Sequence, residues 1–181
     1  MSKLSPSNNI NNLVIIGHMG SGKSTIGLYL AKKLSYSFID TDELIVKKIK
    51  MSISEYFKNF GERQFRLIEE KTILDLLDKN TKNIIAFGGG AFQSFRVRQS
   101  VKKNALSIWL KCDLKTLAFR CSRKKNRPLL QDKNIKSVLK ELNKLRADNF
   151  AKANYTFNVS KKTKSKLTNE IIDKLNLNEN Y

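Results

Sequence analysis

The chain has 181 residues, 40% of them hydrophobic and 28% charged, which is enough to bury the core of one ordinary domain but short for two. Its formal net charge is +19 at pH 7, and its two cysteines, Cys112 and Cys121, are too far apart for a C-x-x-C metal pair and too few for a disulfide framework. No apolar stretch approaches the length of a membrane span, and residues 1–12 lack the apolar segment of a signal peptide, so we expect a cytoplasmic protein without a membrane partner.

The first predicted elements enclose a glycine-rich loop. Residues 1–12 are polar and are expected to be a disordered leader, the apolar run 13–17 predicts a strand, and a helix is predicted over 23–34. Between strand and helix lies Gly17-His18-Met19-Gly20-Ser21-Gly22-Lys23-Ser24, which fills every specified position of the G-x-x-x-x-G-K-[ST] loop. Because glycines let backbone N–H groups turn inward around a phosphate, the pattern predicts that the chain binds ATP or another nucleoside triphosphate. The alternative is a glycine-rich turn that only joins a strand to a helix.

The side chains of this loop have separate expected roles. Lys23 can reach the β- and γ-phosphates as a point charge, and the Ser24 hydroxyl can ligate Mg²⁺ on the same oxygens. His18 is the only histidine in the sequence, and with no second histidine we interpret it as a tolerated loop residue rather than a metal ligand or base. The predicted nucleotide-binding residues of the loop are Gly20, Ser21, Gly22, Lys23, Ser24 and Thr25.

Two carboxylates follow the second predicted strand, over 37–39, in the sequence Asp40-Thr41-Asp42. Transfer of a phosphoryl group to a hydroxyl needs one group to accept the hydroxyl proton and another near Mg²⁺, and two acids at this spacing could divide these tasks. The alternative is that Asp40 only caps the next helix, with Glu43 three residues on as in a capping box. Capping would explain Asp40 but not Asp42.

Strand-like and helix-like runs alternate along the rest of the chain, which predicts a parallel sheet between layers of helices. Ligands in such folds gather beyond the carboxyl ends of the strands, so residues just after each strand are candidate site residues. Asp113 also follows a strand, but we interpret it as a helix N-cap. The further strands are expected at 83–87, 105–110 and 155–159, and the further helices at 41–50, 53–60, 62–79, 94–103, 113–123, 134–153 and 164–175.

Glycines and arginines provide the remaining signals. The triplet Gly88-Gly89-Gly90 ends a predicted strand at the same sheet edge as the phosphate-binding loop, where it permits close approach of a ligand to the backbone. Arginines are scarce beside lysines, and Arg66, Arg127 and Arg146 could each bind a carboxylate or phosphoryl group with two parallel hydrogen bonds. Arg127 lies in a basic, poorly periodic segment with a proline, which predicts a mobile loop.

Taken together, these motifs in this order resemble the shikimate kinase family from about residue 13 to residue 160. The resemblance implies a three-layer α/β/α sandwich of the P-loop, nucleoside-monophosphate-kinase-like type, with a five-stranded parallel sheet and a mobile lid at about 121–133. It implies a single kinase domain over 13–175 with a disordered tail at 176–181. The implied reaction is ATP-dependent phosphorylation of the 3-hydroxyl of shikimate, with Mg²⁺, in aromatic amino-acid biosynthesis, and we expect a monomer.

The resemblance also implies roles for single residues. Lys23, Asp42 and Arg127 would be catalytic, with Asp42 as the base and Arg127 closing on the phosphates with the lid. Arg120 would pack on adenine, and Ser24 and Asp40 would hold Mg²⁺. The residues implied to bind or line the shikimate site are Asp42, Phe57, Arg66, Glu69, Gly88, Gly89, Gly90 and Arg146.

One departure and three rivals accompany this hypothesis. The family often has Pro and Tyr after the late Arg, whereas Arg146 is followed by Ala147-Asp148-Asn149-Phe150. A nucleoside-monophosphate kinase would place an anionic acceptor beside Asp42, which would repel it, whereas a gluconate kinase is a closer enzyme alternative. A phosphate-loop protein that binds RNA could use the +19 charge, but the lysines are scattered rather than clustered, and we do not favour nucleic-acid binding.

Overall fold

The computed structural model describes residues 12–79, 81–122, 134–160 and 162–177. All strand pairs are parallel, and the five strands lie in the order β2-β3-β1-β4-β5. The strands are β1 (Asn12–Ile16), β2 (Ser37–Asp40), β3 (Asn83–Ala86), β4 (Ala105–Lys111) and β5 (Tyr155–Asn158). The α-helices are α1 (Lys23–Leu34), α2 (Thr41–Ile49), α3 (Ile53–Leu77), α4 (Phe95–Asn104), α5 (Leu114–Ser122), α6 (Ile135–Phe150) and α7 (Lys164–Leu175), and η1 (Ala91–Gln93) is a short 3-10 helix.

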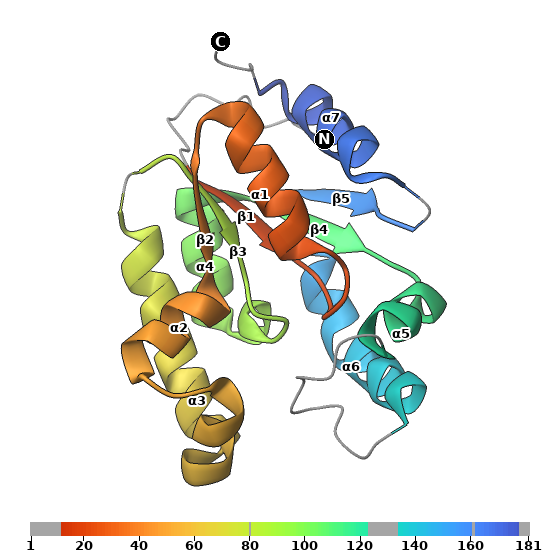
Figure 1. Cartoon of the computed structure of the whole chain (residues 1–181). Coiled ribbons are helices and arrows are strands. Elements are labelled where there is room, and N and C mark those ends of the chain that lie inside the picture. The colour runs from red at the N-terminus through yellow and green to blue at the C-terminus, as the bar shows by residue number, and fades with distance from the viewer. Residues whose placement is uncertain (1–11, 80, 123–133, 161, 178–181) are drawn as a thin grey trace.

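Helices cover both faces of this sheet (Figure 1). Side chains of β1 alternate between two cores: Leu13 and Ile15 pack with residues of α1 and α7, whereas Val14 and Ile16 pack with residues of α3 and α4. Every residue of β1 is buried, as expected for the central strand of a sheet covered on both faces. The predicted three-layer sandwich with a five-stranded parallel sheet is therefore confirmed.

The expected elements agree with the structure except for details of length and continuity. The helices predicted separately over 53–60 and 62–79 form α3, which changes direction at Gly61, where φ is +79°. The 3-10 helix η1 was not predicted, and the predicted helix over 134–153 ends at Phe150. Of the predicted lid, only residues 121 and 122 are described, as the end of α5; the rest lies outside the described residues. No helix in the described part of the chain is long and apolar enough to cross a membrane.

Candidate active site

The phosphate-binding loop connects β1 to α1 at the carboxyl edge of the sheet, and side chains at Gly17 and Gly20 would crowd neighbouring atoms. A Cβ on Gly17 would lie 2.8 Å from the carbonyl oxygen of Leu110, and one on Gly20 would lie 3.0 Å from Cys121 Sγ. Gly20 also has φ of +80°, in the left-handed region that side chains disfavour. At Gly17 and Gly20 the loop therefore packs directly on the ends of β4 and α5.

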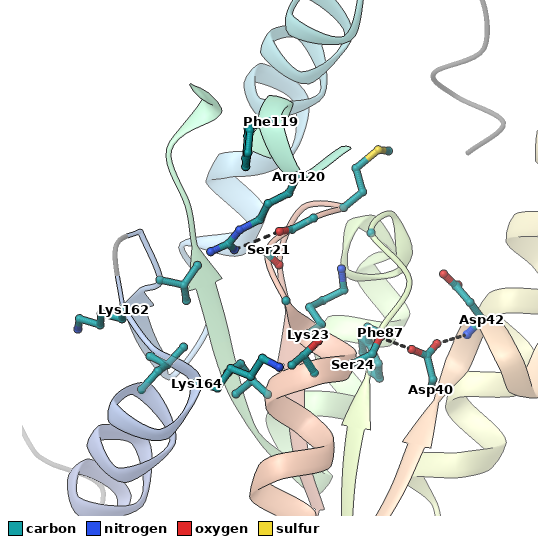
Figure 2. Close-up of a pocket in the computed structure, with 18 of the residues that line it drawn as sticks. Ser21, Lys23, Ser24, Asp40, Asp42, Phe87, Phe119, Arg120, Lys162 and Lys164 are labelled. Carbon is teal, nitrogen blue, oxygen red and sulfur yellow. Dashed lines mark hydrogen bonds between the residues drawn. The ribbon is translucent and has the colours of Figure 1, made fainter. Parts of the chain in front are cut away.

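Lys23, Ser24 and Asp40 surround the mouth of this loop (Figure 2). Lys23 Nζ donates to the carbonyl oxygens of Gly17 and His18, each at 3.1 Å, so the ammonium group lies over the loop. Ser24 Oγ donates to Asp40 Oδ2 at 2.6 Å. A hydroxyl and a carboxylate oxygen are hard ligands of the kind that Mg²⁺ takes together with phosphate oxygens and water, so this pair fits Mg²⁺. Within the described residues no group of three or more His, Cys, Asp or Glu side chains could hold a metal by itself.

Asp40 also caps a helix. Its Oδ1 accepts a hydrogen bond from the Asp42 backbone N–H at 3.0 Å, at the N-terminus of α2. Both interpretations of Asp40 from the sequence are thus compatible, because one carboxylate oxygen caps α2 and the other receives the Ser24 hydroxyl. The cap holds the Asp40 side chain toward the phosphate-binding loop and places Asp42 in the first turn of α2.

A pocket of about 940 Å³ extends from this loop between α5 and the segment that follows β5. Arg120 Nη1 donates to the Gly20 carbonyl oxygen at 3.3 Å, and its side chain lies along the loop, as Figure 2 shows. Prediction from sequence missed part of the lining, although the rule that ligands lie beyond strand ends, applied to the last strand, could have found it. The missed lining residues are Met19, Ile26, Phe87, Phe119, Val159, Lys162, Thr163, Lys164 and Leu167.

The glycine triplet after β3 brings two carboxylates together. A Cβ on Gly88 would lie 2.5 Å from Asp42 Oδ1 and 2.8 Å from Glu69 Oε1, so only glycine fits between them. The Gly88 backbone N–H donates to Thr41 Oγ1 at 2.9 Å, which fixes the start of α2 against this turn. Glu69 is buried, and burial raises its pKa, against the opposing effect of Arg66; the neighbouring Asp42 raises it further.

Arg66 lies on α3 beside the same triplet. It donates to Glu69 Oε2 at 2.6 Å and to Glu62 Oε1 at 2.8 Å, and a Cβ on Gly90 would clash with its guanidinium at 2.5 Å. Its Cζ lies 5.9 Å from the centre of the Phe57 ring, within the range of a cation–π contact. Burial lowers the pKa of Arg66, but the charges and hydrogen bonds of Glu69 and Glu62 together outweigh burial and raise this pKa overall. The guanidinium is thus held in one orientation from two sides.

Arg146 reaches the triplet from α6. Its side chain is 7% exposed, and Nη1 donates to the Gly89 carbonyl oxygen at 2.9 Å. Burial lowers its pKa, and the nearby charge of Arg66 lowers it further, so an anion between the two guanidiniums would be favourable. The absence of the family's Pro and Tyr after Arg146 does not turn the Arg146 side chain outward. Of the residues found there instead, Asp148 is exposed and Phe150 is buried in the core.

The structure thus gathers the predicted residues into two adjoining groups. The phosphate-binding loop, Asp40 and Arg120 line the pocket, and Asp42 and Gly89 line its edge. Beyond that edge lie the other predicted acceptor residues, connected through contacts with the triplet: Phe57, Arg66, Glu69, Gly88, Gly90 and Arg146. Arg127, predicted to act on the phosphates, lies outside the described residues.

A phosphate-binding loop, a hydroxyl–carboxylate pair for Mg²⁺ and an adjoining site with a carboxylate and two arginines define a P-loop kinase of small molecules. The family model for shikimate kinase matches residues 19–176. The chain belongs to the shikimate kinase family.

Individual relatives agree with this assignment. A shikimate kinase of Bartonella henselae is 44% identical over 160 residues, which cover 88% of this chain and 76% of that protein. The solved shikimate kinase of Acinetobacter baumannii in complex with shikimate has a TM-score of 0.87 and 30% identity, covering 92% of this chain and 93% of that one. A gluconokinase of Sinorhizobium meliloti, with a TM-score of 0.61, is 15% identical and covers 93% of each chain, so it shares the fold alone.

Proposed function

We propose that this chain transfers the γ-phosphoryl group of ATP to the 3-hydroxyl of shikimate, giving shikimate 3-phosphate and ADP. The observation that carries the proposal is the placement of Asp42 between the nucleotide pocket and the two guanidiniums of Arg66 and Arg146. A small acceptor with a carboxylate at one end and a hydroxyl at the other would bridge these groups. We also propose that the enzyme is a monomer.

The acceptor carboxylate is bound at the triplet. Arg146, fixed by the Gly89 carbonyl, and Arg66, fixed by Glu62 and Glu69, present N–H donors from two helices. The buried Arg146 guanidinium bonds to a carbonyl oxygen and lies near the partly exposed Arg66, whose charge lowers the pKa of Arg146, so a carboxylate bound between them would be favourable. Phe57, which contacts Arg66, lines the site and Glu69 braces it.

The reaction then needs a proton acceptor and stabilisation of phosphoryl charge. Asp42 accepts the proton of the 3-hydroxyl while the hydroxyl oxygen bonds to the γ-phosphorus of ATP. At the same time the bond from that phosphorus to the bridging oxygen of ADP breaks. Lys23 and the backbone N–H groups of the loop stabilise charge on the phosphate oxygens. Ser24, and Asp40 through water, would hold Mg²⁺, which would supply positive charge to the β- and γ-phosphates. Arg127 is proposed to approach the same oxygens with the lid, and Arg120 to pack on adenine.

A test of this function measures ADP release by the purified protein with Mg²⁺ and ATP. Parallel reactions contain shikimate, gluconate, AMP, or no acceptor. We expect release that depends on shikimate alone. Release with gluconate and not with shikimate would assign the chain to the runner-up reaction. Failure with every acceptor, together with RNA binding that persists at physiological salt, would contradict the proposed kinase activity.

A further inference from the structure

His18 connects the phosphate-binding loop to the helix that carries Arg146. Although it lies within a loop, its side chain is only 3% exposed. Its Nε2 lies 3.1 Å from Asn143 Oδ1, and its ring meets the Phe150 ring edge to face, with centroids 5.1 Å apart. Asn143 and Phe150 both belong to α6, so the sole histidine of the chain bridges two elements of the site.

The helix face that His18 contacts is also the face that presents Arg146. Residues three and four apart on a helix lie on one side, and Arg146 follows Asn143 by three positions and precedes Phe150 by four. The loop and the triplet are neighbours here, because a Cβ on Gly89 would lie 3.4 Å from Arg146 Nη1 and 3.7 Å from the Met19 backbone nitrogen. Movement of α6 relative to His18 would therefore move the Arg146 guanidinium relative to the phosphate-binding loop and to the glycine triplet.

The backbone of the same histidine reaches the nucleotide side of the site. The His18 carbonyl oxygen accepts a hydrogen bond from Lys23 Nζ at 3.1 Å. One residue thus contacts Lys23 through its main chain and the helix of Arg146 through its side chain.

The protonation state of the ring follows from its partners. His18 Nδ1 is buried, and among the described residues it has no hydrogen-bond partner. An unpaired lone pair is less costly there than an unpaired N–H, so the neutral tautomer with hydrogen on Nε2, donating to Asn143 Oδ1, fits best. The charged groups that face the ring are Lys23 and Arg146, which both disfavour an imidazolium.

We propose that His18 is a positioning residue, whose hydrogen bond to Asn143 sets Arg146 at the distance from the phosphate-binding loop that shikimate binding requires. This inference rests on the proposed function, in which Arg146 binds the carboxylate of shikimate. It is distinct from a packing role, because a phenyl ring could still pack against Phe150 but could not donate to Asn143.

The test compares His18→Phe, Asn143→Leu and the double variant in steady-state kinetics. His18→Phe removes the donor to the half-buried Asn143 amide, and Asn143→Leu leaves the buried His18 Nε2 without its acceptor. Because either change lets Arg146 shift, we expect a rise of about tenfold in the KM for shikimate and a KM for ATP within about twofold of wild type. The double variant is expected to show the KM of a single variant, because one shared bond is lost. Asn149→Ala is the matched control, since Asn149 Nδ2 donates from the same helix to Gln93 Oε1 at 2.8 Å.

Two results would overturn the proposal: a KM for shikimate unchanged in His18→Phe, or an equal rise in Asn149→Ala. A second readout is independent of turnover, because the ¹⁵N signals of the only imidazole in untagged protein report its tautomer. We expect the Nε2–H form in wild type and altered signals in Asn143→Leu; signals identical in both would refute the bond. If wild type does not act on shikimate but the NMR result holds, the proposed function fails while the His18–Asn143 connection stands.

Discussion

Asp42 lies where the residues of the nucleotide pocket meet those of the acceptor site. The proposed proton transfer depends on its carboxylate. We expect Asp42→Asn to lower kcat by at least about 100-fold, because an amide cannot accept the proton. ATP binding is expected to stay within about twofold of wild type, since Asp40 and Lys23 remain in place. Stopped assays of ADP release and calorimetric titration with ATP measure the two quantities. Asp148→Asn, which removes an exposed carboxylate from α6, is the control, and near-normal kcat in Asp42→Asn would remove this residue from the mechanism.

Gly88 separates Asp42 from Glu69, and no side chain fits there. We expect Gly88→Ala to push the two carboxylates apart, because the added Cβ would lie 2.5 Å and 2.8 Å from their oxygens. Displacement of a reacting group by about 1 Å can cost about 100-fold in rate, so kcat/KM for shikimate should fall by roughly that factor. Gly89→Ala is the comparison, since its nearest neighbour would be 3.4 Å away. Equal effects of the two substitutions would contradict this steric account.

Residues near each other in the sequence were the ones that sequence patterns predicted well. Lys23 and Ser24 belong to a contiguous motif, and Asp40 follows a strand directly, so local spacing was sufficient to place them. The partner of His18, by contrast, is Asn143, 125 residues further along the chain. No local pattern carries such a contact, and His18 was therefore interpreted as a tolerated loop residue although its side chain is buried.

At the scale of elements, α3 shows how a single glycine shapes the acceptor site. The helix begins with a capping box, in which Ser52 and Glu55 bond reciprocally, and changes direction at Gly61, where φ is +79° and ψ is 167°. Phe57 precedes this kink and Arg66 follows it, yet their side chains are in contact. The kink therefore folds the first part of α3 back toward the arginine.

We expect Gly61→Ala to weaken both stability and substrate binding. A Cβ there meets no atom within 4 Å, so the cost comes from a backbone conformation that is essentially confined to glycine and should be about 1–3 kcal/mol of the free energy of unfolding. Relief of that strain by straightening the helix would separate Phe57 from Arg66 and raise the KM for shikimate. Urea unfolding and steady-state kinetics measure the two effects. A KM that stays unchanged while stability falls would show that the kink does not position Phe57.

Element boundaries were predicted where capping and breaking residues are local. The predicted break between 53–60 and 62–79 coincides with the non-helical Gly61, although the hydrogen-bonded helix continues across it. The 3-10 helix η1 was missed because it is only three residues long and starts directly after the glycine triplet. The end of α6 at Phe150 was also missed, since the following residues have no proline or glycine to mark it.

For the molecule as a whole, burial of its only histidine predicts a pH dependence of stability. The ordinary pKa of histidine is 6.5, and burial lowers the pKa of His18 to about 4. The charges of Arg146 and Lys23 also lower this pKa, whereas the hydrogen bond to Asn143 raises it. Between these values the unfolded chain binds the proton and the folded chain does not, so the free energy of unfolding falls as pH falls from about 6.5 to about 4. The full loss is about 3 kcal/mol.

Comparison of wild type with His18→Phe isolates this effect. The raised pKa of Glu69 makes the free energy of unfolding rise as pH falls, because the folded state holds the Glu69 proton to higher pH. This contribution is common to both proteins. We expect the difference in unfolding free energy between the proteins to change by about 3 kcal/mol across this pH range in denaturant titrations. An imidazole NMR titration of the folded protein should show no protonation near pH 6.5. Parallel pH profiles for the two proteins would contradict the burial of a neutral His18.

The order of the strands has a consequence for how the protein folds during its synthesis on the ribosome. β1, whose end forms the phosphate-binding loop, pairs with β3 and β4, and its Asn12 lies opposite Asn83 and Ala105. Both partners are synthesised long after β1, and pairings between distant segments form slowly. A nascent chain that ends before Ala105 therefore carries the complete phosphate-loop sequence without the second neighbour that holds it. The loop over 17–24 is therefore flanked on both sides only after β4 has been synthesised.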